Sequence, residues 1–277
     1  MNDLFRLLNS RIVKVVLAAV AVTIFTWFSR CNKDKGLNVY GIDQDVKLGQ
    51  QLALQISNDP AQYPILDEQK YPKAYEHLRR ITGVILNSGK VKYRDKFDWK
   101  LNIIHDDNTL NAFCAPGGYI CVYTGLIKYL DHESELAGVL GHEIAHADLR
   151  HSTEAMTRQM GAEAISALIL GNDRDQLSNV VNQLTGLKYS RDNEAEADAA
   201  SIEYLCNTPY DARGTAGFFA KMLKENKGGK QPEFLSTHPS PASRVQDIHD
   251  LWKQKGCTPK EDKEFDALYQ DFKRSLP

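Results

Sequence analysis

Apolar residues fall into separate segments along the chain, and their spacing predicts several helices. An apolar run from Val15 to Phe28 opens the chain, with basic residues on both sides. Residues 41–57 fit a helix only loosely, whereas residues 71–86 place their apolar side chains on one helical face. We therefore expect a helix over residues 71–86 and a weaker helical segment before it.

Shorter alternating segments follow and predict strands. Residues 97–105 alternate between polar and apolar positions and read as a strand. Residues 110–114 and 119–123 flank Pro116-Gly117-Gly118, which is a hairpin signal. After Gly125 the pattern is mostly helical. The expected fold class is α+β, with a small antiparallel sheet and its hairpin packed on a mostly helical body.

The N-terminal apolar segment, residues 12–29, is at the short end of the range of about 17–25 residues that crosses a hydrocarbon core. A cleaved signal peptide favours small residues at its end, and Thr26, Trp27 and Phe28 do not supply them. We expect an uncleaved signal-anchor, with cleavage as the alternative. Residues 1–11 would then be a basic tail, 30–40 a linker, 41–255 the folded domain and 256–277 a C-terminal tail.

Composition argues against some classes of function but does not assign one. The formal net charge of -2 over 277 residues argues against a nucleic-acid partner. Five cysteines without a C-x-x-C pair do not favour a cysteine-based zinc site. From their positions we expect two bridges as hypotheses, Cys114 with Cys121 across the hairpin and Cys206 with Cys257 near the C-terminus.

The segment from His142 to His146 reads His-Glu-Ile-Ala-His, within a helical pattern over residues 133–151. On a helix, residues four apart lie about 40° apart around the axis and about 6 Å along it, so both imidazoles can reach one ion. Glu143 lies beside that ion, where a general base for a water molecule belongs. This pattern predicts one Zn²⁺ per chain. A solvated pair of histidines is the alternative reading.

A third ligand separates these alternatives, because catalytic zinc has three protein ligands. The metzincin spacing is excluded, since Leu149 and Ser152 stand where that class has Gly and His. An alanine-rich helical stretch downstream carries Glu194 and Asp198 on one face, and Glu196 points away. We expect Glu194 as a ligand, and Asp198 as the acceptor of a hydrogen bond from a ligand histidine. An acidic, solvated helix face is the alternative.

Four blocks of sequence together resemble one peptidase family. GHEIAHADLRH followed by YSRDNEAEAD, with NAFCAPGGYICVYTGLI before them and STHPSPASR after them, is similar to the gluzincin family that contains HtpX, BepA and the CAAX prenyl proteases. The resemblance implies a zincin-type body, zinc ligands His142, His146 and Glu194, base Glu143 and acidic partner Asp198. It also implies that His238 lies near the metal as a further catalytic residue, and that Arg244 is structural.

The resulting hypothesis is a zinc metalloendopeptidase that acts on unfolded or misassembled polypeptides in the cell envelope. We expect the body outside the cytoplasm, at the periplasmic side of a bacterial inner membrane, or released after cleavage. An extended substrate would pair with residues 119–123 at a sheet edge. Residues 153–187 would form either a lid or two further core helices. The rival hypothesis is a zinc-stabilised, non-catalytic, chaperone-like binder of unfolded envelope proteins.

Overall fold

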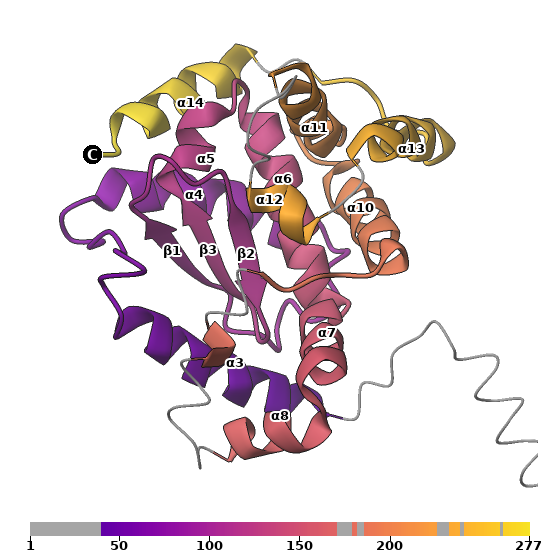
Figure 1. The fold of residues 1–277 in the computed structure, drawn as a ribbon. Helices are drawn as coiled ribbons and strands as arrows, with labels where there is room; N and C mark the ends of the chain where they lie inside the picture. The colour runs from indigo at the N-terminus through magenta and orange to yellow at the C-terminus, as the bar shows by residue number, and fades with distance from the viewer. Residues whose placement is uncertain (1–39, 171–178, 182–185, 226–232, 239–240, 261–262) are drawn as a thin grey trace, which may run out of the picture. The chain divides into compact units, whose positions relative to one another are not determined.

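The computed structural model describes residues 40–170, 179–181, 186–225, 233–238, 241–260 and 263–277 (Figure 1). The expected tail, the signal-anchor and almost all of the linker lie outside these residues. Within them, none of the helices combines the length and the apolar character that a membrane crossing requires. The elements in chain order are α3 Ile42–Ser57, α4 Pro72–Leu86, β1 Lys100–Ile104, β2 Ala112–Ala115, β3 Tyr119–Tyr123, α5 Thr124–Tyr129, α6 Glu133–Asp148, α7 His151–Met160, α8 Ala162–Ile169, α10 Arg191–Leu205, α11 Gly214–Glu225, α12 Glu233–Thr237, α13 Pro241–Gln254 and α14 Lys263–Arg274.

The described strands form one mixed sheet in the order β1-β3-β2. β3 is antiparallel to β2 and parallel to β1, so the α+β class is confirmed but the expectation of an antiparallel sheet is wrong for the second pair. The turn at Gly117 and Gly118, with φ of 75° and 86°, reverses the chain after β2. Because β3 then inserts between β2 and β1, residues 119–123 form the central strand. Their expected position at a sheet edge is therefore also wrong.

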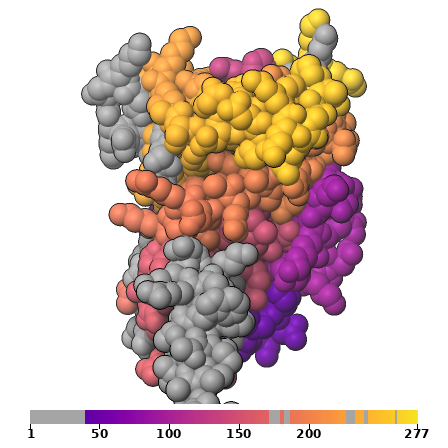
Figure 2. Space-filling view, turned by 90° about the vertical axis from the view of Figure 1, so that its right-hand side faces the viewer, coloured from indigo at the N-terminus to yellow at the C-terminus, as the bar shows by residue number. Residues whose placement is uncertain are grey.

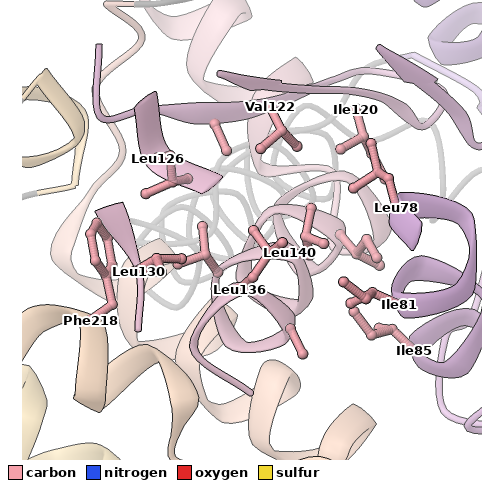
Figure 3. Close-up of a cluster of buried hydrophobic side chains, with 14 of the residues drawn as sticks. Leu78, Ile81, Ile85, Ile120, Val122, Leu126, Leu130, Leu136, Leu140 and Phe218 are labelled. Atoms are coloured by element: carbon pink, nitrogen blue, oxygen red, sulfur yellow. The ribbon is translucent and has the colours of Figure 1, made fainter. Parts of the chain in front are cut away.

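Side chains of β3 alternate between two hydrophobic clusters, one on each face of the sheet. Ile120 and Val122 pack with residues of α4 and α6, including Leu78 and Leu140 (Figure 3). Cys121 lies in the other cluster, with residues of α3, α7 and α8. The sheet is thus covered by helices on both faces, which explains why all five residues of β3 are buried.

Helix α6 packs among α10, α11 and the sheet, and each of its 16 residues is buried. Two glycines allow neighbouring helices to approach it. A Cβ at Gly138 would lie 2.2 Å from the backbone nitrogen of Thr215 on α11, and a Cβ at Gly141 would lie 2.7 Å from Oγ of Ser201 on α10. On the outer side, α13 packs against α10, and Figure 2 shows its yellow surface directly above the orange surface of α10.

The helix expected over residues 133–151 ends earlier, at Asp148. Arg150 adopts a left-handed conformation with φ of 64°, which interrupts the helix, and α7 begins at His151. The segment 153–187 contains most of α7 and all of α8 in its described part. Met156 of α7 and Leu168 of α8 are buried in the cluster beneath the sheet.

The structure also tests the expected C-terminal tail and the two expected disulfide bridges. The expected tail, residues 256–277, contains α14, whose Tyr269 and Phe272 are fully buried. The bridge between Cys206 and Cys257 is present. Cys114 and Cys121 are free and buried, so that expected bridge is wrong. The two thiols belong to different clusters on opposite faces of the sheet, because their strand positions differ in parity.

Candidate metal centre

Helix α6 carries His142, Glu143 and His146 into the centre of the molecule. It begins with a capping box, in which Oε2 of Glu135 accepts hydrogen bonds from the backbone N–H groups of Asp131 at 2.8 Å and His132 at 3.1 Å. The four-residue spacing brings Nε2 of His142 within 3.0 Å of Nε2 of His146. The helix therefore presents two buried imidazole nitrogens to one point.

Helix α10 brings a carboxylate to the same point. Oγ of Ser190 accepts a hydrogen bond from the backbone N–H of Asn193 at 3.1 Å, which caps the helix before Arg191. One turn later, the two oxygens of Glu194 lie 3.5 Å from Nε2 of His142 and 3.4 Å from Nε2 of His146. Glu196 has a side chain that is 55% exposed. The structure thus places Glu194, and not Glu196, between the two histidines.

His238 follows α12 and supplies a fourth group. Its Nδ1 lies 3.2 Å from Nε2 of His142 and 2.9 Å from Oε1 of Glu194. Its ring stacks on Phe234 of α12, with centroids 4.3 Å apart. Ligand atoms of the four groups, His142, His146, Glu194 and His238, all lie within 4.8 Å of one another. The structure therefore brings together residues that are 96 positions apart in the sequence.

Asp198 and Arg244 surround this cluster from the side of α10 and α13. Oδ1 of Asp198 lies 2.9 Å from Nδ1 of His142, the ring nitrogen that faces away from the cluster. Arg244 donates two hydrogen bonds to Asp198, at 2.6 and 2.7 Å, and one to Oε2 of Glu194 at 2.5 Å. Although burial opposes ionisation, the hydrogen bond from Arg244 holds the pKa of Asp198 below its ordinary value. Both acids are therefore fixed as carboxylates.

Glu143 differs from the other acids of the site. Its side chain is buried, and neither of its oxygens accepts a hydrogen bond of good geometry from a described residue. Burial raises its pKa, and the electrostatic contribution of neighbouring His238 only partly offsets this. Oε1 of Glu143 lies 3.4 Å from Nε2 of His238. A buried carboxylate that lacks a hydrogen bond of good geometry is costly, so its presence here points to a role in chemistry.

The donor set fits a zinc ion. Two imidazole nitrogens and a carboxylate that converge on one point are the ligand types of catalytic zinc sites. Burial alone would favour a neutral imidazole, but Asp198 and Glu194 raise the pKa of His142 to about 9. The same two carboxylates favour a positive charge at this point, so a metal ion would compete with a proton for His142. The residues present could hold a metal ion with the charge and ligand number of Zn²⁺.

Two residues of the site, buried His151 and partly buried Tyr189, were not identified from the sequence. Nδ1 of His151 lies 3.1 Å from Nδ1 of His146, and the ring of Tyr189 stacks on His146 with centroids 3.8 Å apart. His151 was not among the site residues expected from the sequence. Its position five residues after His146 was the available signal, but the break in the helix at Arg150 decides where it points.

Comparison with known proteins supports the same assignment. The chain is 26% identical over 272 residues to the beta-barrel assembly-enhancing protease of Escherichia coli (strain K12), a match that covers 91% of this chain and 54% of that protein. It is 30% identical over 188 residues to the metalloprotease YcaL of the same organism, covering 65% of this chain and 70% of that protein. A putative beta-barrel assembly-enhancing protease of Vibrio cholerae is 31% identical over 172 residues, with 34% of its length covered.

The chain thus spans between a third and about half of the length of the beta-barrel assembly-enhancing proteases that it matches. The family description "Peptidase family M48" matches residues 72–251, which begin at α4 and end within α13. This range contains every residue of the candidate metal centre, from His142 on α6 to Arg244 on α13. The chain belongs to peptidase family M48.

Proposed function

We propose that this protein is a zinc-dependent metalloendopeptidase that hydrolyses peptide bonds within polypeptides. The observation that carries the proposal is the buried carboxylate of Glu143, which accepts no well-formed hydrogen bond from the described residues, beside His142, His146 and Glu194. A site that served only to hold a metal would have no use for a buried acid that lacks a well-formed hydrogen bond. A general base, by contrast, has to keep its oxygens available for a proton from water.

In this proposal His142, His146 and Glu194 hold Zn²⁺, one ion per chain. When bound, the zinc supplies a Lewis acid that polarises the scissile carbonyl and makes an adjacent water more acidic. Glu143 accepts the proton of that water and then passes it toward the leaving amine. Its raised pKa suits this exchange, because a base with a very low pKa holds a proton too weakly to transfer it. Asp198 fixes the orientation of His142.

His238 has a different place in this mechanism. Its Nδ1 lies among the donor atoms, while its Nε2 faces Glu143 at 3.4 Å. A catalytic zinc site keeps one position open for water or substrate. His238 therefore has to turn away from Glu194 when the substrate enters. It contacts the reacting groups, but it is not required to retain the metal.

The substrate in this proposal is an extended polypeptide segment that pairs with an edge of the sheet. β2, and not β3, has the required position, because it pairs with β3 on one side and packs beside α6. Backbone hydrogen bonds along such an edge select an extended conformation more than a particular sequence. Unfolded or misassembled envelope proteins are substrates of this kind. Two relatives have names that refer to beta-barrel assembly, which is consistent with this class.

We further propose that the folded body acts outside the cytoplasm. The disulfide between Cys206 and Cys257 is typical of an oxidising compartment. Residues 12–29 would hold the body at the membrane as a signal-anchor, or would be removed during export. Fractionation of cells tests the alternatives. An anchored chain stays with the membranes after a carbonate wash at full length, whereas cleavage gives a soluble chain that begins near residue 30.

The deciding experiment for the activity is digestion of casein by the purified full chain, with and without a zinc chelator. We expect cleavage that the chelator abolishes and that added Zn²⁺ restores. The rival, a chaperone-like module stabilised by zinc, predicts no cleavage but suppression of the aggregation of an unfolded protein. Cleavage that persists in the presence of the chelator would contradict the metalloendopeptidase. It would also contradict the chaperone-like module, which predicts no cleavage.

A further inference from the structure

The second ring nitrogen of each histidine on α6 faces a partner on the side away from the metal donors. For His142 the partner is Asp198, at 2.9 Å. For His146 the partner is not an acid but another imidazole, since its Nδ1 lies 3.1 Å from Nδ1 of His151. His151 is buried, with 3% of its surface exposed, and its Nε2 lies 3.3 Å from Oε2 of Glu196. A continuous chain of contacts thus runs from His146 to Glu196.

The positions of the hydrogens in this series of contacts follow from the two groups at its ends, the metal-facing His146 and the carboxylate of Glu196. If Nε2 of His146 binds the metal, its Nδ1 carries the hydrogen and donates to Nδ1 of His151. A neutral His151 that accepts at Nδ1 carries its own hydrogen on Nε2. That hydrogen points to the carboxylate of Glu196, which only accepts. Each group then has one role, and no nitrogen is left without a partner.

Helix α10 therefore supports both metal-facing histidines. Asp198 contacts His142 directly, and Glu196, two residues earlier, reaches His146 through His151. Glu194 lies on the same helix and contacts the metal-facing nitrogens of both. The indirect route is needed because Glu196 points away from the donors and has an exposed side chain. His151 spans the remaining distance.

The backbone at the end of α6 places His151 in this position. Arg150, with φ of 64°, turns the chain so that α7 starts directly at His151. A left-handed conformation is unfavourable for a residue with a side chain, so the surrounding contacts must hold it. Nε of Arg150 donates to Asp45 on α3 at 2.5 Å, and its Nη2 donates to the backbone oxygen of Tyr40 at 2.5 Å. The turn that presents His151 is therefore fixed from outside α6.

We propose that His151 is a positioning residue for the metal ligand His146: it accepts the Nδ1 hydrogen of His146, transmits the orientation imposed by Glu196, and thereby raises the affinity of the site for zinc. This inference rests on the proposed metal site. It assigns no contact between His151 and the substrate or the metal.

The test measures zinc affinity of the purified full chain by competition with a coloured chelator. His151→Phe keeps the ring volume but removes the acceptor, and we expect its Kd for zinc to rise about 10- to 100-fold. His151→Asn places an amide oxygen close to the position of Nδ1, and we expect it to stay within about threefold of wild type. His105→Ala, which removes an exposed histidine outside the site, is the control and should bind zinc as wild type does.

Two further measurements separate positioning from folding. The metal-free stability of His151→Phe should stay close to wild type, because the ring is retained, and Co²⁺ bound to this variant should have an altered visible spectrum. If His151→Phe does not fold, Glu196→Ala is measured instead, with an expected rise of a few fold in Kd. Zinc affinities of both His151→Phe and Glu196→Ala within about twofold of wild type would overturn the inference. A wild-type chain that binds no zinc would instead refute the metal site itself.

Discussion

Nδ1 of His142 lies 2.9 Å from Oδ1 of Asp198, so one helix, α10, supplies both a candidate metal ligand and the acid that orients another ligand. Asp198 in turn accepts two hydrogen bonds from Arg244, which also contacts Glu194. The two acids and His142 are therefore positioned as one unit. A change in one of them should alter how the others hold a metal.

Asp198→Asn should weaken zinc binding without preventing folding. The variant keeps the size of the side chain but loses the charge that favours a hydrogen on Nδ1 of His142. We expect a rise of about tenfold in the Kd for zinc, measured by chelator competition. Asp192→Asn, on the exposed face of the same helix, is the matched control and should leave the Kd unchanged. Equal affinities in both variants would contradict the role of Asp198.

Glu143→Gln should separate catalysis from metal binding. The variant removes the proposed base but none of the ligand groups, so about one zinc per chain should remain bound. We expect kcat/KM for a peptide substrate to fall by about 100-fold to 10,000-fold. Zinc content by atomic absorption and cleavage of a fluorogenic peptide are the two readouts. Activity close to that of wild type would show that Glu143 is not the base.

Glu194→Gln and Glu196→Gln form a matched pair two residues apart. The first removes a charged ligand from between His142 and His146, so zinc content and activity should both be lost, with an affinity decrease of more than about 100-fold. The second changes an exposed side chain whose amide oxygen can still accept from His151. It should stay close to wild type in both measurements. The reverse order would move the ligand by two positions.

His238→Ala distinguishes a catalytic site from a closed structural site. If the remaining three groups hold the metal, the variant should keep about one zinc per chain after dialysis against zinc-free buffer. A structural site with four ligands should instead lose its zinc under the same conditions, because each ligand is then needed. Phe234, on which the ring of His238 stacks, is left in place so that the packing around α12 is preserved. Loss of zinc would favour the non-catalytic rival.

The two buried free cysteines should be unreactive in the folded protein. Burial raises the pKa of Cys121 to about 12 and holds the pKa of Cys114 well above its ordinary value. Both thiols should therefore resist alkylation by iodoacetamide at about pH 8 in the native protein and react once it is unfolded, as followed by peptide mass spectrometry.

Removal of the Cys206–Cys257 bridge by double substitution to serine should lower the free energy of unfolding by about 2–4 kcal/mol, measured by urea titration of the metal-free chain. Cys114→Ala is the comparison that leaves the bridge intact. An unchanged unfolding midpoint in the double variant would contradict the stabilising role of the bridge.

Local signals in the sequence were sufficient for much of this protein. The four-residue spacing of His142 and His146, and the same spacing of Glu194 and Asp198, define faces of helices whatever the surrounding fold. The hairpin at Gly117-Gly118 is likewise predicted by local residues, because glycine favours positive φ. The helix α4 and the bridge between Cys206 and Cys257 were also expected and are present.

Tertiary packing decided what these local patterns leave open. The sheet is mixed because β3 returns between β1 and β2, and strand order depends on contacts distant in sequence. The expected pairing of Cys114 with Cys121 failed because of the β2–β3 register, in which the two thiols face different layers of the core. The place of His151 beside His146 depends on the left-handed turn at Arg150, and contacts with α3 hold that turn in place. Periodicity specifies the face of one element, but the partner of that face is determined only when the elements pack together.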